Sequence, residues 1–231
     1  MPSCYRHIFF DWDETLWDFE ANSRKVLWHL VQQYKLASHD EQASRLVECY
    51  HHHNQRYWEL YRRGRIDAHT LRIGRWQQTL RDFGLDESLT AELAEQYLEL
   101  LPEQTQLIAH AREVIRQLCR HFTLHVLTNG FQQVQERKLL RCGLSGYFQH
   151  LITAERAGSR KPDPAIFQYA FQLTGASADN SLMVGDSVEA DWMGAQAVGM
   201  DCILLVRDAA VSVPPQVPII NSLQDLIDRL C

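Results

Sequence analysis

The stretch FFDWDETLW, residues 9–17, joins a run of large apolar side chains to two aspartates that stand one residue apart. The short apolar run His7–Phe10 is typical of a buried strand, and Asp11 and Asp13 follow it directly. Because an unpaired buried charge is costly, these two carboxylates need either solvent or a positive group between them. The stretch therefore predicts a strand that ends at a charged site.

After Pro102 the sequence alternates between extended and helical patterns. The expected strands are FTLHVL (122–127), HLIT (150–153), SLMVG (181–185) and CILLV (202–206). The expected helices lie near residues 107–120, 131–143, 164–175, 191–198 and 223–230, and PPQVP (214–218) is expected to be a connecting loop. Strands that alternate with helices imply a parallel sheet covered on both faces. We therefore expect an α/β fold with a Rossmann-like parallel sheet.

Residues 20–100, in contrast, contain only helical patterns. Val26, Leu27, Leu30 and Val31 recur at the spacing of an amphipathic helix, and Gly64 and Gly84 mark boundaries between helices. The first strand therefore lies some 110 residues before the rest of its sheet. The simplest interpretation is an α/β core of residues 1–16 and 104–231, with an all-helical unit of residues 17–103 inserted after the first strand.

Composition excludes several classes of protein. The chain has 231 residues, 45% hydrophobic and 23% charged, with a formal net charge of −6 and no basic block that would bind a nucleic acid polymer. No apolar stretch is long enough to cross a membrane, and the first residues lack the pattern of a signal peptide. Six scattered cysteines without a close pair favour a reducing cytoplasm. The oligomeric state stays open.

Polar residues follow each of the predicted core strands. In open parallel sheets, ligands bind at the carboxyl ends of the strands, near the point where the strand order reverses. The groups expected at that edge are Asp11 and Asp13, then Thr128-Asn129-Gly130, then Lys161, and finally Asp186 and Ser187 with Asp191 further on. The sequence thus predicts carboxylates, a hydroxyl beside a glycine turn, and one lysine in a single place.

Each of these groups alone has an ordinary structural interpretation, as a turn, a helix cap or a solvated loop residue. Together they suit one reaction, phosphoryl transfer through an aspartate. Three acids at one sheet edge repel each other unless a cation lies among them, and oxygen ligands of this number suit Mg²⁺. With Mg²⁺ and Lys161 neutralising charge, a carboxylate can attack a phosphate. Asp13 can then exchange protons with the leaving oxygen and with water, while Thr128 and nearby amides donate to phosphoryl oxygens.

Four motifs in the right order resemble those of the haloacid dehalogenase-like (HAD) hydrolase superfamily, in its phosphatase branch. They are DWDET, LTNG, KPDPAIF and VGDSVEADWMGAQAVGM. The resemblance implies a phosphatase with Asp11 as nucleophile, Asp13 as general acid and base, and Thr128, Asn129 and Lys161 as phosphate-binding residues. It implies Mg²⁺ held by Asp11, the main-chain carbonyl of Asp13, and Asp186, with Asp191 in the outer metal shell or orienting Lys161.

The predicted helical insertion resembles the cap of the same family, which shields the site from water and supplies substrate selectivity. One departure stands at the return from cap to core, where many relatives have Pro-Gly and this chain has Ala109-His110. This difference leaves the hinge geometry open.

The substrate is expected to be a small phosphorylated metabolite. DETLW, GRIDAHTLRIGRW and TNGF resemble bacterial pyrimidine 5′-nucleotidases. On this hypothesis Phe131 or Trp17 stacks against a base, and Arg75 faces the entrance and attracts the anion. The structural alternatives are a core position for each aromatic ring and a solvated helix face for Arg75. His51-His52-His53 cannot all face one ion on a helix, and a polar helix surface is expected there.

Other functions stay open at this stage. A broad phosphatase for phosphoglycolate or sugar phosphates, or a sugar-phosphate mutase, uses the same core groups. A dehalogenase also uses an aspartate nucleophile, but it needs neither Asp13 nor Mg²⁺. A binding or regulatory module on the same scaffold is expected to have lost the nucleophile, the acid or the lysine, and all three are present.

Overall fold

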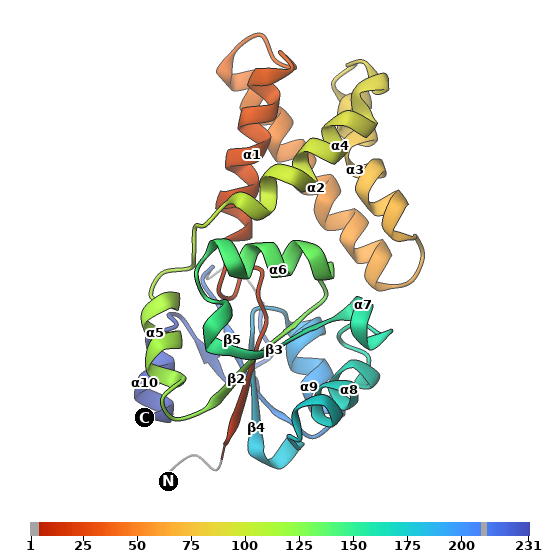
Figure 1. The fold of residues 1–231 in the computed structure, drawn as a ribbon. Helices are drawn as coiled ribbons and strands as arrows, with labels where there is room; N and C mark the ends of the chain where they lie inside the picture. The colour runs from red at the N-terminus through yellow and green to blue at the C-terminus, as the bar shows by residue number, and fades with distance from the viewer. Residues whose placement is uncertain (1–4, 209–211) are drawn as a thin grey trace. The chain divides into compact units, whose positions relative to one another are not determined.

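The computed structural model describes residues 5–208 and 212–231. The chain forms two compact units. One is an α/β unit made of Met1–Phe19 and Thr105–Cys231, and the other is a helical unit made of Glu20–Gln104. Figure 1 shows the helical unit inserted in the chain between β1 and β2.

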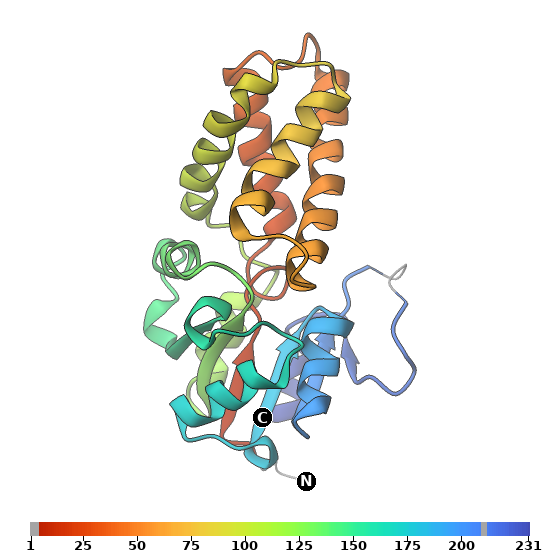
Figure 2. The same cartoon turned by 90° about the vertical axis from the view of Figure 1, so that its right-hand side faces the viewer.

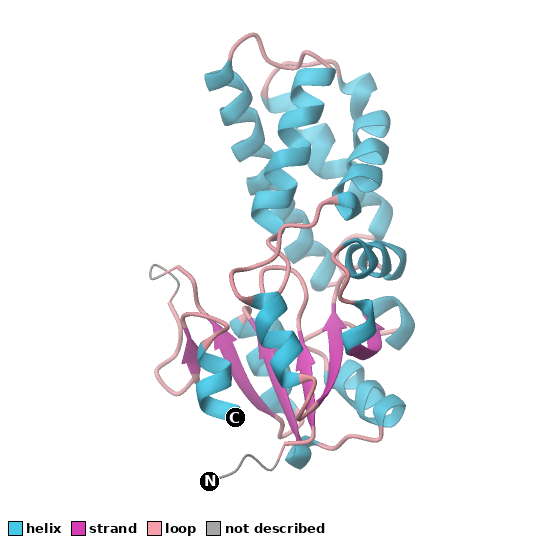
Figure 3. Cartoon of the chain, turned by 60° about the vertical axis from the view of Figure 1, so that its left-hand side comes forward, coloured by secondary structure: helices cyan, strands magenta, loops and turns pink. Residues whose placement is uncertain are grey.

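The α/β unit is built on a six-stranded sheet in the order β3-β2-β1-β4-β5-β6, with parallel pairing throughout, which confirms the expected fold class (Figure 3). The strands are β1 (His7–Phe10), β2 (Thr123–Thr128), β3 (Phe148–Thr153), β4 (Ser181–Gly185), β5 (Asp201–Leu205) and β6 (Ile219–Ile220). The central β1 lies between β2 and β4, so the order reverses beside the residues that follow β1. This reversal is where ligands bind in such sheets.

The sixth strand is absent from the sequence prediction. Only Ile219 and Ile220 form it, directly after the predicted PPQVP loop, and they pair with Leu204 and Leu205 of β5. Two residues are too few to show an extended pattern in a sequence.

Helices cover both faces of the sheet in Figure 1. On one face lie α5 (Ala111–Leu118) and α10 (Asp225–Leu230), and on the other lie α8 (Pro164–Thr174) and α9 (Gly194–Ala197). Phe9 of β1 packs with α8 through Phe167, while its neighbours Ile8 and Phe10 point to the opposite face. All four side chains are fully buried, as expected for a strand between two layers of helices.

Further helices and turns complete the α/β unit. They are α6 (Gln132–Arg141), α7 (Ala154–Ala157), the 3₁₀ turns η3 (Ser145–Tyr147) and η4 (Ala178–Asn180), and the π-helical turn η5 (Val188–Met193). Local chemistry sets their ends. The carboxylate of Asp163 caps the first turn of α8 ahead of Pro164, and Gly175 ends that helix in a left-handed conformation.

The helical unit contains α1 (Phe19–Gln33, whose first residue belongs to the α/β unit), α2 (Asp40–Arg62), α3 (Ala68–Asp82) and α4 (Thr90–Leu100). Two 3₁₀ turns, η1 (Glu87–Leu89) and η2 (Leu101–Glu103), flank α4. The helices pack side by side (Figure 2) around the aromatic rings of Tyr50, Trp76 and Tyr97, which are all fully buried. The ring centroids of Tyr50 and Trp76 are 4.5 Å apart. The unit therefore has an apolar core of its own.

Helix α5 of the α/β unit begins directly after His110, which has a φ of +66°. This is the left-handed conformation that glycine adopts most easily. At the position where the resembled family has Pro-Gly, His110 therefore takes the backbone conformation of a glycine. Among the described residues, no helix has the length and apolar character that crossing a membrane requires.

Candidate active site

Three acidic side chains meet beyond the carboxyl ends of β1 and β4. Asp11 follows β1, Asp186 follows β4, and Asp191 lies in the π-helical turn η5. One carboxylate oxygen from each lies within 4.8 Å of the other two. The sequence prediction placed these acids at one sheet edge, and the structure brings them together.

Lys161 inserts its ammonium group into this cluster. Its Nζ lies 2.9 Å from Oδ1 of Asp11 and 2.6 Å from Oδ1 of Asp191, and its side chain is only 1% exposed. The second oxygen of Asp191 accepts hydrogen bonds from the backbone amides of Asp186 (3.2 Å) and Ser187 (3.0 Å). Asp191 thus holds both Lys161 and the loop after β4.

A glycine permits this arrangement. A Cβ atom on Gly185, the last residue of β4, would lie 2.2 Å from the carboxyl group of Asp191. Real Cβ atoms do not approach other atoms so closely, and the Asp191 side chain is completely buried. Gly185 therefore lets the buried carboxylate lie against the strand end.

The charges of the cluster are unbalanced, with three carboxylates around one ammonium. Burial raises the pKa of Asp11 to about 7; Lys161 opposes this shift, and the nearby charge of Asp191 adds to it. Burial, and then repulsion by Asp11 and Asp191, raise the pKa of Asp186 well above its ordinary value. Burial disfavours the charge on Lys161, but Asp11 and Asp191 together hold its pKa above the ordinary value. The site therefore favours additional positive charge.

This donor set fits a divalent cation with oxygen ligands. Lys161 and two amides donate to Asp191, whereas the carboxylate of Asp186 accepts a hydrogen bond of 3.3 Å from the buried hydroxyl of Thr15. Asp11 and Asp186 therefore offer carboxylate oxygens of the kind that Mg²⁺ takes in proteins. The sequence analysis did not anticipate the contact of Thr15, although this residue belongs to the DWDET motif.

Asp13 lies among donors from α6. Lys138 Nζ lies 2.6 Å from its Oδ1, and Gln135 Nε2 donates to its Oδ2 over 2.7 Å. Gln135 and Lys138 are three residues apart, so they extend from one face of the helix. The sequence analysis missed both residues. Their spacing on the helix after the TNG turn indicates that they share a helix face, but it does not indicate that this face contacts Asp13.

Gln135 also connects Asp13 to Thr128. The same Nε2 atom lies 3.0 Å from Oγ1 of Thr128, which in turn accepts a hydrogen bond of 3.1 Å from the amide of Gly130. A Cβ atom on Gly130 would lie 2.2 Å from Gln135 Nε2. The TNG turn therefore brings its backbone close to the side chain that contacts Asp13.

Asn129 was expected to bind phosphate, and the structure gives its side chain another position. Its Nδ2 donates to the backbone carbonyl of Lys161 over 2.9 Å, and its Oδ1 accepts from the amide of Lys161 over 2.8 Å. Both polar atoms of the side chain thus hold the backbone of Lys161. Asn129 thus positions the backbone of that lysine.

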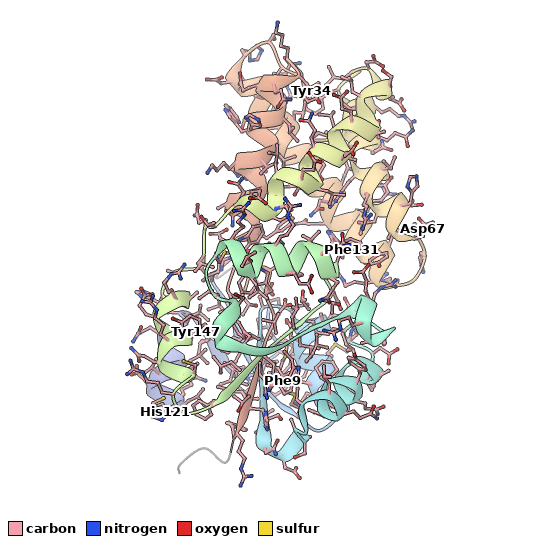
Figure 4. The ribbon with its side chains drawn as sticks, in the orientation of Figure 1. Phe9, Tyr34, Asp67, His121, Phe131 and Tyr147 are labelled. Carbon is pink, nitrogen blue, oxygen red and sulfur yellow. The ribbon has the colours of Figure 1, made fainter. Side chains whose placement is uncertain are left out.

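The three residues considered for substrate contact are all buried. Trp17 is 0% exposed, with the ammonium of Lys138 3.9 Å from the centre of its ring. Phe131 precedes α6 (Figure 4) and is 7% exposed. Neither aromatic ring is exposed enough in this structure to offer an open face for a base to stack on.

Arg75 was expected to be exposed at an entrance, and the structure shows instead that it is buried. It is 4% exposed inside the helical unit, where its guanidinium donates to Oδ1 of Asn54 over 2.5 Å. Its carbon Cζ lies 5.8 Å and 5.4 Å from the ring centres of Tyr50 and Tyr97. Arg75 therefore packs in the aromatic core of that unit, because its planar cation stacks well on tyrosine faces.

Known hydrolases resemble this chain both in sequence and in fold. Residues 5–199 match the family model described as haloacid dehalogenase-like hydrolase. The chain is 30% identical to the HAD-hydrolase YfnB of Bacillus subtilis over 93% of this chain and 89% of YfnB. The crystal structure of YfnB bound to magnesium superposes with a TM-score of 0.87, covering 98% of each chain at 28% identity.

Two pyrimidine 5′-nucleotidases are similar over most of their length. PynA of Streptococcus pneumoniae is 30% identical, with 86% of this chain and 83% of PynA covered. YjjG of Escherichia coli is 29% identical, with 97% of each chain covered.

Proposed function

The chain belongs to the haloacid dehalogenase-like hydrolase family, and on that premise we propose that it hydrolyses phosphate monoesters through an aspartyl-phosphate formed on Asp11. One observation carries this proposal: Asp11 lies against the buried ammonium of Lys161, while Asp13, two residues on, is held separately by Lys138. One carboxylate is thus set beside a phosphate-binding cation, and the other is oriented for proton exchange.

Asp11, Asp186 and the main-chain carbonyl of Asp13 are the groups that would hold Mg²⁺. When bound, the ion would offset the charge of the phosphate and of the attacking carboxylate. The excess of carboxylates over ammonium groups supports this cofactor, as does the magnesium bound in YfnB. Asp191 remains the residue that orients Lys161, since its oxygens are already engaged.

In the first step, a carboxylate oxygen of Asp11 attacks phosphorus and the ester P–O bond breaks. Asp13, in its acid form, gives a proton to the leaving alcohol oxygen. Lys161, the hydroxyl of Thr128 and the amides of the TNG turn are the groups proposed to donate to the phosphoryl oxygens.

In the second step, Asp13 takes a proton from water as the water oxygen attacks phosphorus. The bond between phosphorus and Asp11 breaks, which releases inorganic phosphate and the free carboxylate. Asp13 returns to its acid form, so atoms, charges and protons balance over the cycle.

The described side chains argue against a dehalogenase. Such an enzyme has no use for an acid two residues after the nucleophile, yet here Gln135 and Lys138 both contact Asp13. A mutase would use the same groups and would have to keep water from the aspartyl-phosphate. A binding module would not need the complete set of Asp11, Asp13 and Lys161.

For the substrate, we propose a pyrimidine nucleoside 5′-monophosphate. The similarity to PynA and YjjG supports this choice. The helical unit is proposed to act as the cap that selects the substrate. A broad phosphatase that accepts phosphoglycolate or sugar phosphates is the second candidate.

A phosphate-release screen with and without Mg²⁺ tests both the proposed chemistry and the proposed substrate. Pyrimidine and purine 5′-monophosphates, phosphoglycolate and sugar phosphates would be compared for the native protein and for Asp11→Asn. We expect Mg²⁺-dependent release with a preference for pyrimidine nucleotides, and loss of release in the variant. Equal rates on all substrates would keep the chemistry and reject the nucleotide assignment, while an active Asp11→Asn protein would reject the chemistry.

A further inference from the structure

A second group of metal-binding side chains lies inside the helical unit. Cys49 and His53 belong to α2, and Asp82 is the last residue of α3. One candidate ligand atom from each lies within 4.8 Å of the other two. We propose that Sγ of Cys49, Nε2 of His53 and a carboxylate oxygen of Asp82 bind a zinc ion that joins α2 to α3. This inference is independent of the proposed function.

The helix spacing explains how two ligands come together. Cys49 and His53 are four residues apart, so they lie on one face of α2, one turn above the other. His53 is 6% exposed, and its Nε2 lies 2.8 Å from Oδ2 of Asp82. Of the three adjacent histidines, only His53 faces this cluster: His52 is exposed and His51 half-buried. The polar helix surface expected for all three is therefore wrong for His53.

Two of the three separations lie within about half an ångström of those around a tetrahedral zinc ion. Bonds of about 2.0 Å to nitrogen and oxygen and about 2.3 Å to sulfur place neighbouring ligand atoms roughly 3.3–3.6 Å apart. Cys49 Sγ lies 3.7 Å from Asp82 Oδ2, and His53 Nε2 lies 2.8 Å from the same oxygen. Ligand shifts of about half an ångström, within reach of side-chain rotation, would therefore create the site.

The chemistry of the three groups selects zinc over magnesium. A thiolate and an imidazole are softer ligands than the oxygens of the Asp11 cluster, and together they suit Zn²⁺. A thiolate and a carboxylate carry two negative charges, which balance the ion. Gln78 Nε2 donates to Oδ1 of Asp82 over 2.8 Å and orients the carboxylate. The Asp82 side chain is 40% exposed, so water has access as the fourth ligand.

A simple His53–Asp82 hydrogen bond is the structural alternative. It accounts for the 2.8 Å contact, and the thiol of Cys49, which is directed at the same oxygen, completes a set of three possible metal ligands. Nδ1 of His53 is buried without a hydrogen-bond partner among the described residues, so zinc at Nε2 would move the ring proton to Nδ1. A metal bond at Nε2 would supply the stronger orienting contact.

Cobalt titration of the metal-free chain of 231 residues tests the proposal. Co²⁺ substitutes for Zn²⁺, and a cobalt–thiolate bond has a charge-transfer absorption in the near ultraviolet that oxygen ligands do not produce. We expect this band to saturate at one ion per chain, to disappear on addition of Zn²⁺, and to be absent in Cys49→Ser. Binding at the Asp11 cluster would give no thiolate band, so the two sites are distinguished.

Two further variants test whether the cobalt band arises from the proposed ligands. Cys119→Ser removes another half-buried thiol, in the α/β unit, and is expected to keep the full band. Asp82→Asn changes an exposed side chain and is expected to weaken cobalt binding roughly tenfold or more while circular dichroism stays unchanged. No thiolate band in the native protein, or a band that survives in Cys49→Ser, would overturn the proposal. An unchanged affinity in Asp82→Asn would overturn the assignment of that ligand.

Discussion

Lys138 Nζ lies 2.6 Å from Oδ1 of Asp13, across 125 residues of sequence. The lysine side chain is only 3% exposed, and its ammonium also lies over the ring of the buried Trp17. A buried cation that touches a carboxylate and an aromatic face is held firmly in position. Lys138, itself held by the ring of Trp17, thus fixes the side chain of Asp13, the proposed general acid and base.

Lys138→Met is therefore expected to lower kcat by roughly 10- to 100-fold, because misplacement of an acid–base group removes much of its effect. Steady-state kinetics on the best phosphate ester from the screen measures this, with KM expected to change little. Lys25→Met, at an exposed lysine of α1, is the matched control and should retain native kcat. Native kcat in Lys138→Met would mean that Asp13 needs no such support.

Gly185→Ala is expected to disable the site with little change in the rest of the fold. The added Cβ would collide with the Asp191 carboxylate at 2.2 Å and displace the group that holds Lys161. We expect a loss of activity of roughly 100-fold or more, since misplaced catalytic groups can cost this much. Gly146→Ala is the control, because no atom lies within 4 Å of a Cβ there. Equal activity of the two variants would contradict the close packing at Gly185.

The contribution of Asp11 and Asp186 to the stability of the metal-free protein is expected to fall as pH rises from about 4 to about 7. The pKa of Asp11 is raised to about 7 and that of Asp186 is also raised, so the folded chain keeps protons that the unfolded chain releases in this range. Mg²⁺ should therefore raise Tm more at pH 8 than at pH 5.

Asp186→Asn removes one of the repelling carboxylates. At pH 8 without metal it is expected to raise Tm by about 2–4 °C for each kcal/mol of repulsion relieved, and to reduce the stabilisation by Mg²⁺. Differential scanning fluorimetry at both pH values, with and without Mg²⁺, measures both effects. A lower Tm in the metal-free variant would show that this carboxylate stabilises the fold.

His125 is expected to make the protein sensitive to acid. Burial, together with His7 and His150, lowers the pKa of His125 to about 3. Between pH 6.5 and pH 3 the unfolded chain therefore binds a proton at this histidine that the folded chain does not, and the contribution of His125 to stability is lost as pH falls through this range. From pH 7 to pH 5 this loss is about 1–2 kcal/mol.

Urea unfolding at pH 5 and pH 7 measures the contribution of His125. His125→Leu should reduce the difference in unfolding free energy between the two pH values, whereas His121→Gln, at an exposed histidine, should leave it unchanged. The same pH dependence in His125→Leu as in the native chain would assign the acid sensitivity to other groups.

The sequence by itself determined the order and type of the main elements. Apolar periodicity is a local property, so the strand SLMVG was predicted with the bounds of β4, and β1 followed from the run His7–Phe10. The parallel sheet followed from the alternation of strands and helices, and it placed the residues after each strand at one edge. This is why the sequence alone predicts that Asp11, Lys161, Asp186 and Asp191 lie together.

Only the tertiary structure decided which side chains hold these groups in place. Lys138 and Asp13, or Asn129 and the backbone of Lys161, meet because of the way that one helix or loop packs against a distant strand end. Likewise, Arg75 and His53 are buried because their helix faces pack against neighbouring helices. Periodicity records that a face is polar or apolar, but a buried polar partner depends on positions far apart in the chain, which short-range patterns do not encode.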